Sequence, residues 1–364
     1  MRQFLIYIIL ATAACKTVPN DNFDALDLDT DGFSVVQGDC DDSDSSAFPG
    51  AAYLEDETAC MRDKDGDGFG DRSPENIDVT KGIDCDDTKV DLTPEDLNND
   101  GSYDGCRTTS VTSGDFHSCA IMDDASIHCW GTNDDTQLDP PNIEALAITA
   151  GADHSCAVDF DGSAHCWGGN WAGQTDHLSG TYQTISSGAW HTCALTTLGE
   201  IRCWGSTDRG QAPAPDGNFI DVTAGRWNSC GISIDGEAIC WGEDNQGQSS
   251  PPMENHRYVQ IDAGLDQTCA VSDLGALICW GEVRPDQPTI TSTIYEVSVS
   301  DEHACILSDE GEVTCWGSDD KGQASPPEEE FVAISTGLYH SCGLTDYGLT
   351  ICWGDEEFGQ TSTP

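Results

Sequence analysis

Two cysteines ten positions apart recur along this sequence, often with a histidine two residues before the first. The stretch HTCALTTLGEIRCWG, residues 191–205, shows the pattern with His191, Cys193 and Cys203. Imidazole and thiolate groups are the ligands that zinc prefers, and reactive cysteines carry out redox chemistry. The same two cysteines could instead form a structural disulfide. The pattern therefore permits a metal site, a redox site or a covalent cross-link.

Comparison of the copies separates these alternatives. The position two residues before the first cysteine holds Asn228 and Gln267 in two copies. In the other five it holds histidine: His117, His154, His191, His303 and His340. A metal ligand does not normally alternate with asparagine and glutamine, whereas a hydrogen-bonding position of a scaffold can. We therefore expect a scaffold role. No combination of residues indicates a catalytic site, and we predict that the protein is not an enzyme.

Short strands must position the cysteines. In HTCALT, Cys193 and Leu195 alternate with Thr192 and Ala194, which is typical of a strand. If residues 197–199 form a hairpin turn that ends in a left-handed glycine, Cys193 lies directly opposite Cys203, within disulfide reach. The spacing therefore predicts one cross-strand disulfide per copy: Cys119–Cys129, Cys156–Cys166, Cys193–Cys203, Cys230–Cys240, Cys269–Cys279, Cys305–Cys315 and Cys342–Cys352.

The copies form seven units that extend from residue 107 to the C-terminus. Each first cysteine follows the previous one by 36 to 39 residues. A unit of this size cannot bury its own apolar surface, but neighbouring units can cover one another. Seven units of three or four strands predict an all-β fold, a closed seven-bladed β-propeller over residues 107–364. An open β-solenoid is the alternative, and it would leave end strands exposed.

A second group of candidate ligands precedes the repeats. The chain has a formal net charge of −52, which disfavours nucleic-acid binding, and many of its carboxylates are concentrated between residues 15 and 106. Two D-x-D-x-D-G openings and a D-x-N-x-D-G opening resemble the start of calcium loops, without the later glutamate of an EF-hand. The predicted calcium ligands are Asp27, Asp29, Asp31, Asp39, Asp41, Asp42, Asp63, Asp65, Asp67, Asp71, Asp84, Asp86, Asp87, Asp96, Asn98 and Asp100.

The acidic segment has two related halves, and each contains two cysteines. The simplest pairing is Cys40–Cys60 and Cys85–Cys106, although three connectivities exist for four cysteines. The segment resembles thrombospondin type 3 repeats and the DCDD metal-binding motif of bacterial surface proteins. This resemblance implies calcium bound by several short aspartate runs. The alternative is a solvated acidic spacer.

The N-terminus carries an export signal. Arg2 precedes an apolar run that is too short to span a bilayer, which is typical of a signal peptide over residues 1–14. Ala13 and Ala14 before Cys15 resemble a bacterial lipobox, and this resemblance implies a lipidated Cys15. The alternative is ordinary signal cleavage nearby. Lys16 resembles the sorting residue of Gram-negative lipoproteins that remain at the outer membrane. The number of cysteines also indicates an oxidising compartment.

The repeat itself resembles a known family. The motif His-Ser/Thr-Cys-Ala, followed by Cys-Trp-Gly and then by Gly-Gln in five units, is similar to the short bacterial form of the regulator of chromosome condensation repeat. This resemblance implies a seven-bladed propeller. The eukaryotic founder of the family is a guanine-nucleotide exchange factor, and a bacterial relative inhibits β-lactamases. Both activities remain alternatives here.

The residue directly before the histidine position varies from unit to unit. It is an aromatic residue in four units and an acid in three: Phe116, Asp153, Trp190, Trp227, Asp266, Glu302 and Tyr339. In a propeller these seven residues share one end of the ring, where exposed aromatic side chains beside charges are typical of a protein-binding surface. We therefore predict a surface-anchored, calcium-binding protein whose propeller binds an unidentified protein. Glycan binding is an alternative, because aromatic faces also stack on sugars, and the rings could instead fold inward over the axis.

Overall fold

The computed structural model describes residues 47–49, 60–62, 107–252, 256–282, 284 and 286–363. The chain divides into two units, Met1–Cys106 and Arg107–Pro364. In the first unit, strands β1 (Ala47–Pro49) and β2 (Cys60–Arg62) pair antiparallel. The predicted signal peptide, Cys15, the calcium ligands and the pairs Cys40–Cys60 and Cys85–Cys106 lie outside the residues whose side chains are described.

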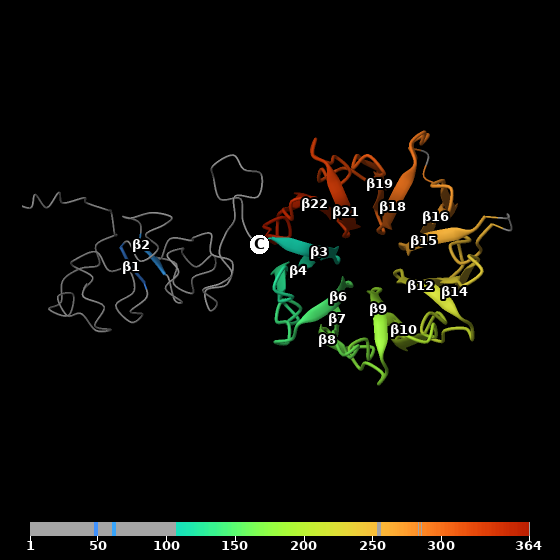
Figure 1. Ribbon diagram of the computed structural model, residues 1–364, viewed down its shortest axis with the longest axis horizontal. Coiled ribbons are helices and arrows are strands. Elements are labelled where there is room, and N and C mark those ends of the chain that lie inside the picture. The colour runs from blue at the N-terminus through green and yellow to red at the C-terminus, as the bar shows by residue number, and fades with distance from the viewer. Residues whose placement is uncertain are drawn as a thin grey trace, which may run out of the picture. The chain divides into compact units, whose positions relative to one another are not determined.

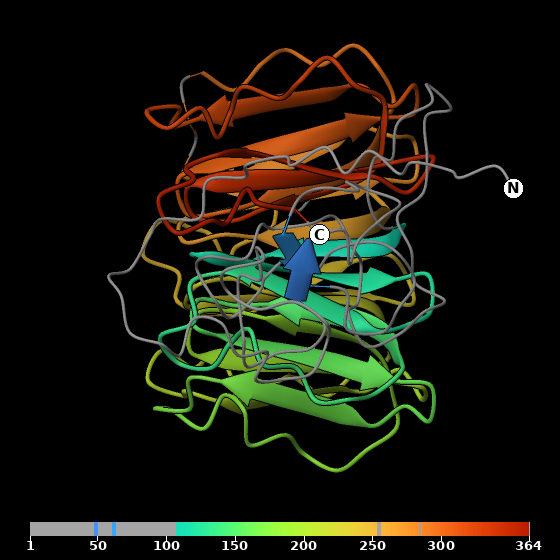
Figure 2. The ribbon, with the colours of Figure 1, turned by 90° about the vertical axis from the view of Figure 1, so that its left-hand side faces the viewer.

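The second unit is a ring of seven three-stranded antiparallel sheets around a central axis (Figure 1). Each sheet is one blade, and its first strand lies nearest the axis. Figure 2 views the ring from its rim, with the earlier blades (teal to green) below and the later blades (orange to red) above. In chain order the blades are β3 (Thr108–Ser113), β4 (His117–Met122) and β5 (Ile127–Gly131); β6 (Ala145–Ala150), β7 (His154–Asp159) and β8 (Ala164–Gly168); β9 (Tyr182–Ser187), β10 (His191–Thr196) and β11 (Ile201–Gly205); β12 (Phe219–Ala224), β13 (Asn228–Ser233) and β14 (Ala238–Gly242); β15 (Tyr258–Ala263), β16 (Gln267–Ser272) and β17 (Leu277–Gly281); β18 (Ile294–Val299), β19 (His303–Ser308) and β20 (Val313–Gly317); and β21 (Phe331–Thr336), β22 (His340–Thr345) and β23 (Thr350–Gly354).

The predicted disulfides are confirmed in every blade. In the third blade Cys193 is the direct partner of Cys203 across the β10–β11 pair, as the hairpin argument requires. Gly199 has a φ of 85°, and its N–H donates to the carbonyl of Thr196 at 2.9 Å, which closes the turn. Equivalent bonds join the cysteine pairs of the other six blades. Each blade is thus cross-linked internally, and the bonds do not join one blade to the next.

Apolar side chains between adjacent blades form the core. Between the second and third blades, Val158 packs with Tyr182, Ile185 and Trp204. Similar clusters recur around the ring, because alternate residues of each strand point toward the neighbouring blade.

The last blade closes the ring against the first without a shared strand. β3 contacts β21 and β22, and the indole Nε1 of Trp130 donates to the carbonyl of Gln360 at 2.9 Å. The predicted closed propeller is therefore confirmed, and the open solenoid is wrong. The described residues contain no helix, and thus none that could cross a bilayer.

Candidate interaction surface

The recurrent histidines join neighbouring blades. His154 Nε2 lies 2.8 Å from the hydroxyl of Thr192 in the next blade, and that hydroxyl donates to the carbonyl of Gln174 at 3.0 Å. The imidazole must therefore donate from Nε2. Burial lowers the pKa of His154 to about 3, so the ring stays neutral. The other four histidines contact Ser118, Ser155, Ser229 and Ser341 in the same way. This position is part of the scaffold, as the sequence comparison indicated.

The Cys-Trp-Gly tryptophans also join blades. The indole of Trp204 donates to the carbonyl of Gln174 in the preceding blade at 2.8 Å. Gln174 is buried, and its side chain accepts the N–H of Ala172 at 2.8 Å. The glutamine of the Gly-Gln pair thus shapes its own loop and holds the next blade. Sequence comparison detected this pair but not its partner. The same bond involves Trp130, Trp167, Trp241, Trp280 and Trp353.

The junction between the fifth and sixth blades departs from this pattern. Gln267 replaces the histidine, and Ala304 replaces the hydroxyl that would face it. Among the described residues, the buried indole nitrogen of Trp316 has no hydrogen-bond partner. Other contacts bridge this junction: Asp286 accepts the N–H of Gly317 at 2.8 Å, and Arg284 donates to carbonyls of the sixth blade.

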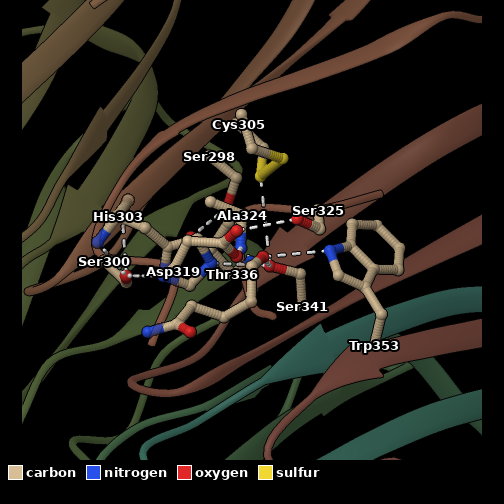
Figure 3. The surroundings of a disulfide bond; sticks show 12 residues. Ser298, Ser300, His303, Cys305, Asp319, Ala324, Ser325, Thr336, Ser341 and Trp353 are labelled. Carbon is tan, nitrogen blue, oxygen red and sulfur yellow. Dashed lines mark hydrogen bonds between the residues drawn. A yellow bond between two sulfur atoms is a disulfide. The ribbon is translucent and has the colours of Figure 1, made fainter. Parts of the chain in front are cut away.

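The regular arrangement returns at the next junction, which Figure 3 shows. Nε2 of His303 lies 2.6 Å from the hydroxyl of Ser341, and its Nδ1 lies 3.0 Å from the hydroxyl of Ser300 (Figure 3). The indole of Trp353 donates to the carbonyl of Gln323. Ser300 occupies the position that is glycine in the other units, such as Gly114. Gly114 lies close against the ring of His117, the histidine of its own unit. Between blades four and five, Asn228 keeps a side-chain bond to the hydroxyl of Thr268 at 3.3 Å, so only the junction between blades five and six, among the seven described, lacks this contact.

The seven residues proposed for partner binding occupy equivalent places. Each follows an inner strand, and its carbonyl accepts the N–H of the residue after Cys-Trp-Gly in the same blade, as in Ser206 N–H to Trp190 at 2.8 Å. All seven side chains are partly exposed. The set is Phe116, Asp153, Trp190, Trp227, Asp266, Glu302 and Tyr339. They therefore lie at one end of the ring.

Aromatic side chains form two groups at this end. Trp190 and Trp227 are stacked, with ring centroids 6.3 Å apart and planes inclined by 15°. Trp171, which is 61% exposed, lies 5.7 Å from Trp190. The second group is Phe116 with Tyr339 at 6.0 Å and Phe358 at 5.6 Å. Sequence analysis missed Trp171 and Phe358, because both lie in loops without strand alternation.

The axis contains a small polar cavity of about 150 Å³. Its wall includes hydroxyls of inner strands that accept N–H groups of the next blade, as Thr112 does from Ala150 at 3.1 Å. Arg226 from the fourth blade crosses the mouth and pairs with Asp115 at 3.3 Å and with Asp301. This ion triad connects blades one, four and six.

Three carboxyl groups on consecutive inner strands have raised pKa values. Burial raises the pKa of Asp221 and of Glu296 to about 7, and that of Asp262 to about 6. Their charged forms keep some stabilisation, because Asp221 accepts the N–H of Ile261 at 3.3 Å and Asp262 that of Val299 at 2.7 Å. Within the described part of the chain, no group of three or more His, Cys, Asp or Glu side chains could hold a metal ion.

Comparison with known proteins agrees with this geometry. The unit is a seven-bladed β-propeller, and the solved structures that resemble it include two plant ectodomains. The ectodomain of the Physcomitrella patens receptor kinase CR4 is 23% identical, with a TM-score of 0.59 over 68% of this chain and 73% of that one. The CRINKLY WD40 ectodomain of the Arabidopsis thaliana receptor kinase ACR4 is also 23% identical, with a TM-score of 0.60 over 68% of this chain and 96% of that one. These similarities show the fold alone.

The repeat family is identified by sequence. The regulator of chromosome condensation (RCC1) repeat matches residues 109–137, 146–174, 183–211, 219–248, 294–323 and 331–360. Six of the seven blades therefore match this repeat. The fifth blade, which carries Gln267, is not among the matched segments. A search of curated proteins finds no match to this chain.

Proposed function

We propose that this protein is exported and anchored at the cell surface through Cys15, that its acidic segment binds calcium, and that its propeller recognises another protein. Disulfides in all seven blades support export, because such bonds persist in oxidising compartments. The two similar plant structures are ectodomains of receptor kinases. A propeller that works outside the cell is consistent with both observations.

The convergence of partly exposed aromatic side chains at one end of the ring supports protein recognition. Most buried scaffold positions repeat from blade to blade, whereas the residues at this end vary among Phe, Tyr, Trp, Asp and Glu. Aromatic residues dominate the energetics of protein interfaces, and the acids beside them supply specificity. The end that carries Trp190 and Tyr339 is therefore the proposed interaction surface.

Site-specific photo-cross-linking in cells of the source organism tests this proposal. A photoreactive phenylalanine analogue replaces Trp190 in one variant and Tyr295 in another. Tyr295 is 66% exposed and is the second residue of β18, at the opposite end of an inner strand. We expect the Trp190 variant to cross-link a discrete protein and the Tyr295 variant to give none. Cross-linking from Tyr295 alone would refute this surface.

Calcium binding and anchoring need separate measurements on the full chain. Calorimetric titration with calcium should give binding, and the number of sites should fall when Asp65 and Asp67 are both changed to asparagine. Exchange of a predicted ligand that leaves the titration unchanged would contradict the calcium proposal. Mass spectrometry of the native protein should show a lipidated Cys15 at its N-terminus, and a mature chain that begins elsewhere would contradict lipidation.

A further inference from the structure

The three tryptophans outside the Cys-Trp-Gly motifs lie together on the surface. The chain contains ten tryptophans, and seven belong to the repeat motif. The remaining three, Trp171, Trp190 and Trp227, come from the second, third and fourth units and lie in contact as one group. We call this group the tryptophan platform. The ring needs no tryptophan at positions 190 and 227, because the equivalent places in other blades hold Asp153 or Glu302.

Carboxylates flank both sides of the platform. Gly169 packs between the ring of Trp171 and the side chain of Asp153, which places that acid beside the platform. On the other side, Glu243 pairs with Arg209 at 2.5 Å. The pKa of Asp266 is raised mainly by burial and further by the negative charges of Glu282 and Glu243, so these acids lie near one another. We call Asp153, Glu243 and Asp266 the acidic rim.

One guanidinium already lies on the platform. Arg209 is 5.7 Å from the ring centroid of Trp227 and pairs with Glu243. An indole and a carboxylate thus hold one arginine together. Trp190 lies one blade away from Trp227, and Asp153 lies two blades away on the same surface. The platform therefore offers a second indole and a second carboxylate. Arg226 and Arg284 also lie near this end, but Arg226 pairs with Asp115 and Asp301, and Arg284 donates to carbonyls.

We propose that the tryptophan platform and its acidic rim bind an arginine-bearing segment of a partner protein. The inference rests on the proposed function and names the chemistry of its partner. A planar guanidinium can stack on an indole and bond to a carboxylate at the same time, which a lysine ammonium cannot do as well. The net charge of −52 favours a cationic partner at long range.

Calorimetry of the full chain with synthetic peptides tests the inference. The probes are an arginine–glycine peptide, a lysine–glycine peptide of equal length and charge, and a neutral chitin oligosaccharide. Because the whole chain is acidic, cation binding alone is not the readout. We expect the arginine peptide to bind several-fold more tightly than the lysine peptide at about 0.15 M salt, where general attraction is screened.

The variants locate the binding site. Trp190→Ala and Trp227→Ala should each weaken the arginine peptide by about tenfold or more. Trp171→Ala, in an exposed loop, gives a variant whose fold does not depend on the side chain. Asp153→Asn should reduce affinity and its salt dependence. Tyr295→Ala, at the opposite end, is the control and should bind like the parent. Non-reducing mass spectrometry verifies that each variant keeps its disulfides.

Three results would overturn the inference: equal affinity for the arginine and lysine peptides, tryptophan variants that bind like the parent, or Trp190-dependent binding of the oligosaccharide instead. The cross-linking experiment distinguishes this failure from failure of the proposed function. If a native protein cross-links from position 190 while the arginine peptide shows no dependence on tryptophan, the protein-binding surface stands and the arginine chemistry is wrong.

Discussion

Transfer of the histidine–hydroxyl contact into the junction between blades five and six should stabilise that junction. The double variant Gln267→His with Ala304→Ser would recreate the pair that five other junctions use, in which Nε2 and hydroxyl lie 2.6 to 2.8 Å apart and both groups are buried. In the native protein Gln267 donates to the carbonyl of Glu282 at 3.0 Å, while its buried Oε1 has no partner among the described residues.

The magnitude follows from the cost of unpaired buried groups. Gln267→His alone places an imidazole opposite a methyl group, and an unpaired buried polar group costs about 1–3 kcal/mol. A satisfied hydrogen bond contributes about 1 kcal/mol net. The free energy of unfolding of the double variant should therefore exceed the value expected from adding the two single effects by about 1–2 kcal/mol. Urea unfolding of the protein with its disulfides intact, monitored by tryptophan fluorescence, measures this coupling.

A matched cycle checks the reasoning in the opposite direction. His191→Gln with Ser229→Ala imposes the side chains of the exceptional junction on blades three and four. Each single change should lower the free energy of unfolding by about 1–3 kcal/mol, and the pair should lower it by less than their sum. If both cycles are additive within about 0.5 kcal/mol, the contact carries no coupling and the scaffold role of these histidines is refuted.

Three further perturbations have predictable outcomes. The pKa of Asp221 is about 7 in the folded protein, above its unfolded value, so its contribution to stability falls as pH rises from about 4 through 7. Asp221→Asn should therefore change the free energy of unfolding more favourably at about pH 8 than at about pH 5. An equal effect in urea unfolding at both pH values would contradict this. The buried histidines have lowered pKa values, such as about 3 for His154, so their contribution to stability is present above about pH 6.5 and is lost as pH falls. The free energy of unfolding of His154→Gln should therefore depend less steeply on pH in this range. An unchanged slope would refute this contribution of His154. Arg226→Ala leaves two partly buried carboxyls without their cation and should lower the midpoint of thermal unfolding, whereas Arg202→Ala, which breaks a more exposed pair, should not. Equal midpoints for the two variants would mean that the triad adds no stability.

Repetition explains how much of the fold could be predicted. A single hairpin with Cys193 and Cys203 has several interpretations, but seven copies with the same spacing define the register of each blade. The closed ring follows because each unit must bury its faces against neighbours. The same comparison identified the histidine position as scaffold, because Asn228 and Gln267 can substitute for it.

Contacts across the axis were not predictable in the same way. Arg226 pairs with Asp115 and Asp301, which hold the equivalent position three blades before it and two blades after it, and the other four units have no charged residue there. Local propensity and alternation carry no information about such pairs. Trp171 was missed for a related reason: it lies in a loop whose path depends on the buried Gln174 beneath it, and this bond is visible only in three dimensions.

Variation between repeats does not by itself mark a functional position. Gln267 and Ala304 depart from the pattern as strongly as Trp190 does, yet both are buried at a junction, where Gln267 donates to the carbonyl of Glu282 in its own blade. Trp190 and Trp227 depart from it on the surface, where a smaller residue in another blade leaves the ring intact. Burial therefore separates the two kinds of variation. A buried departure can be met by other contacts within the ring, as at Asn228 and Gln267, whereas an exposed departure has no such explanation, and for the tryptophan platform we propose a partner.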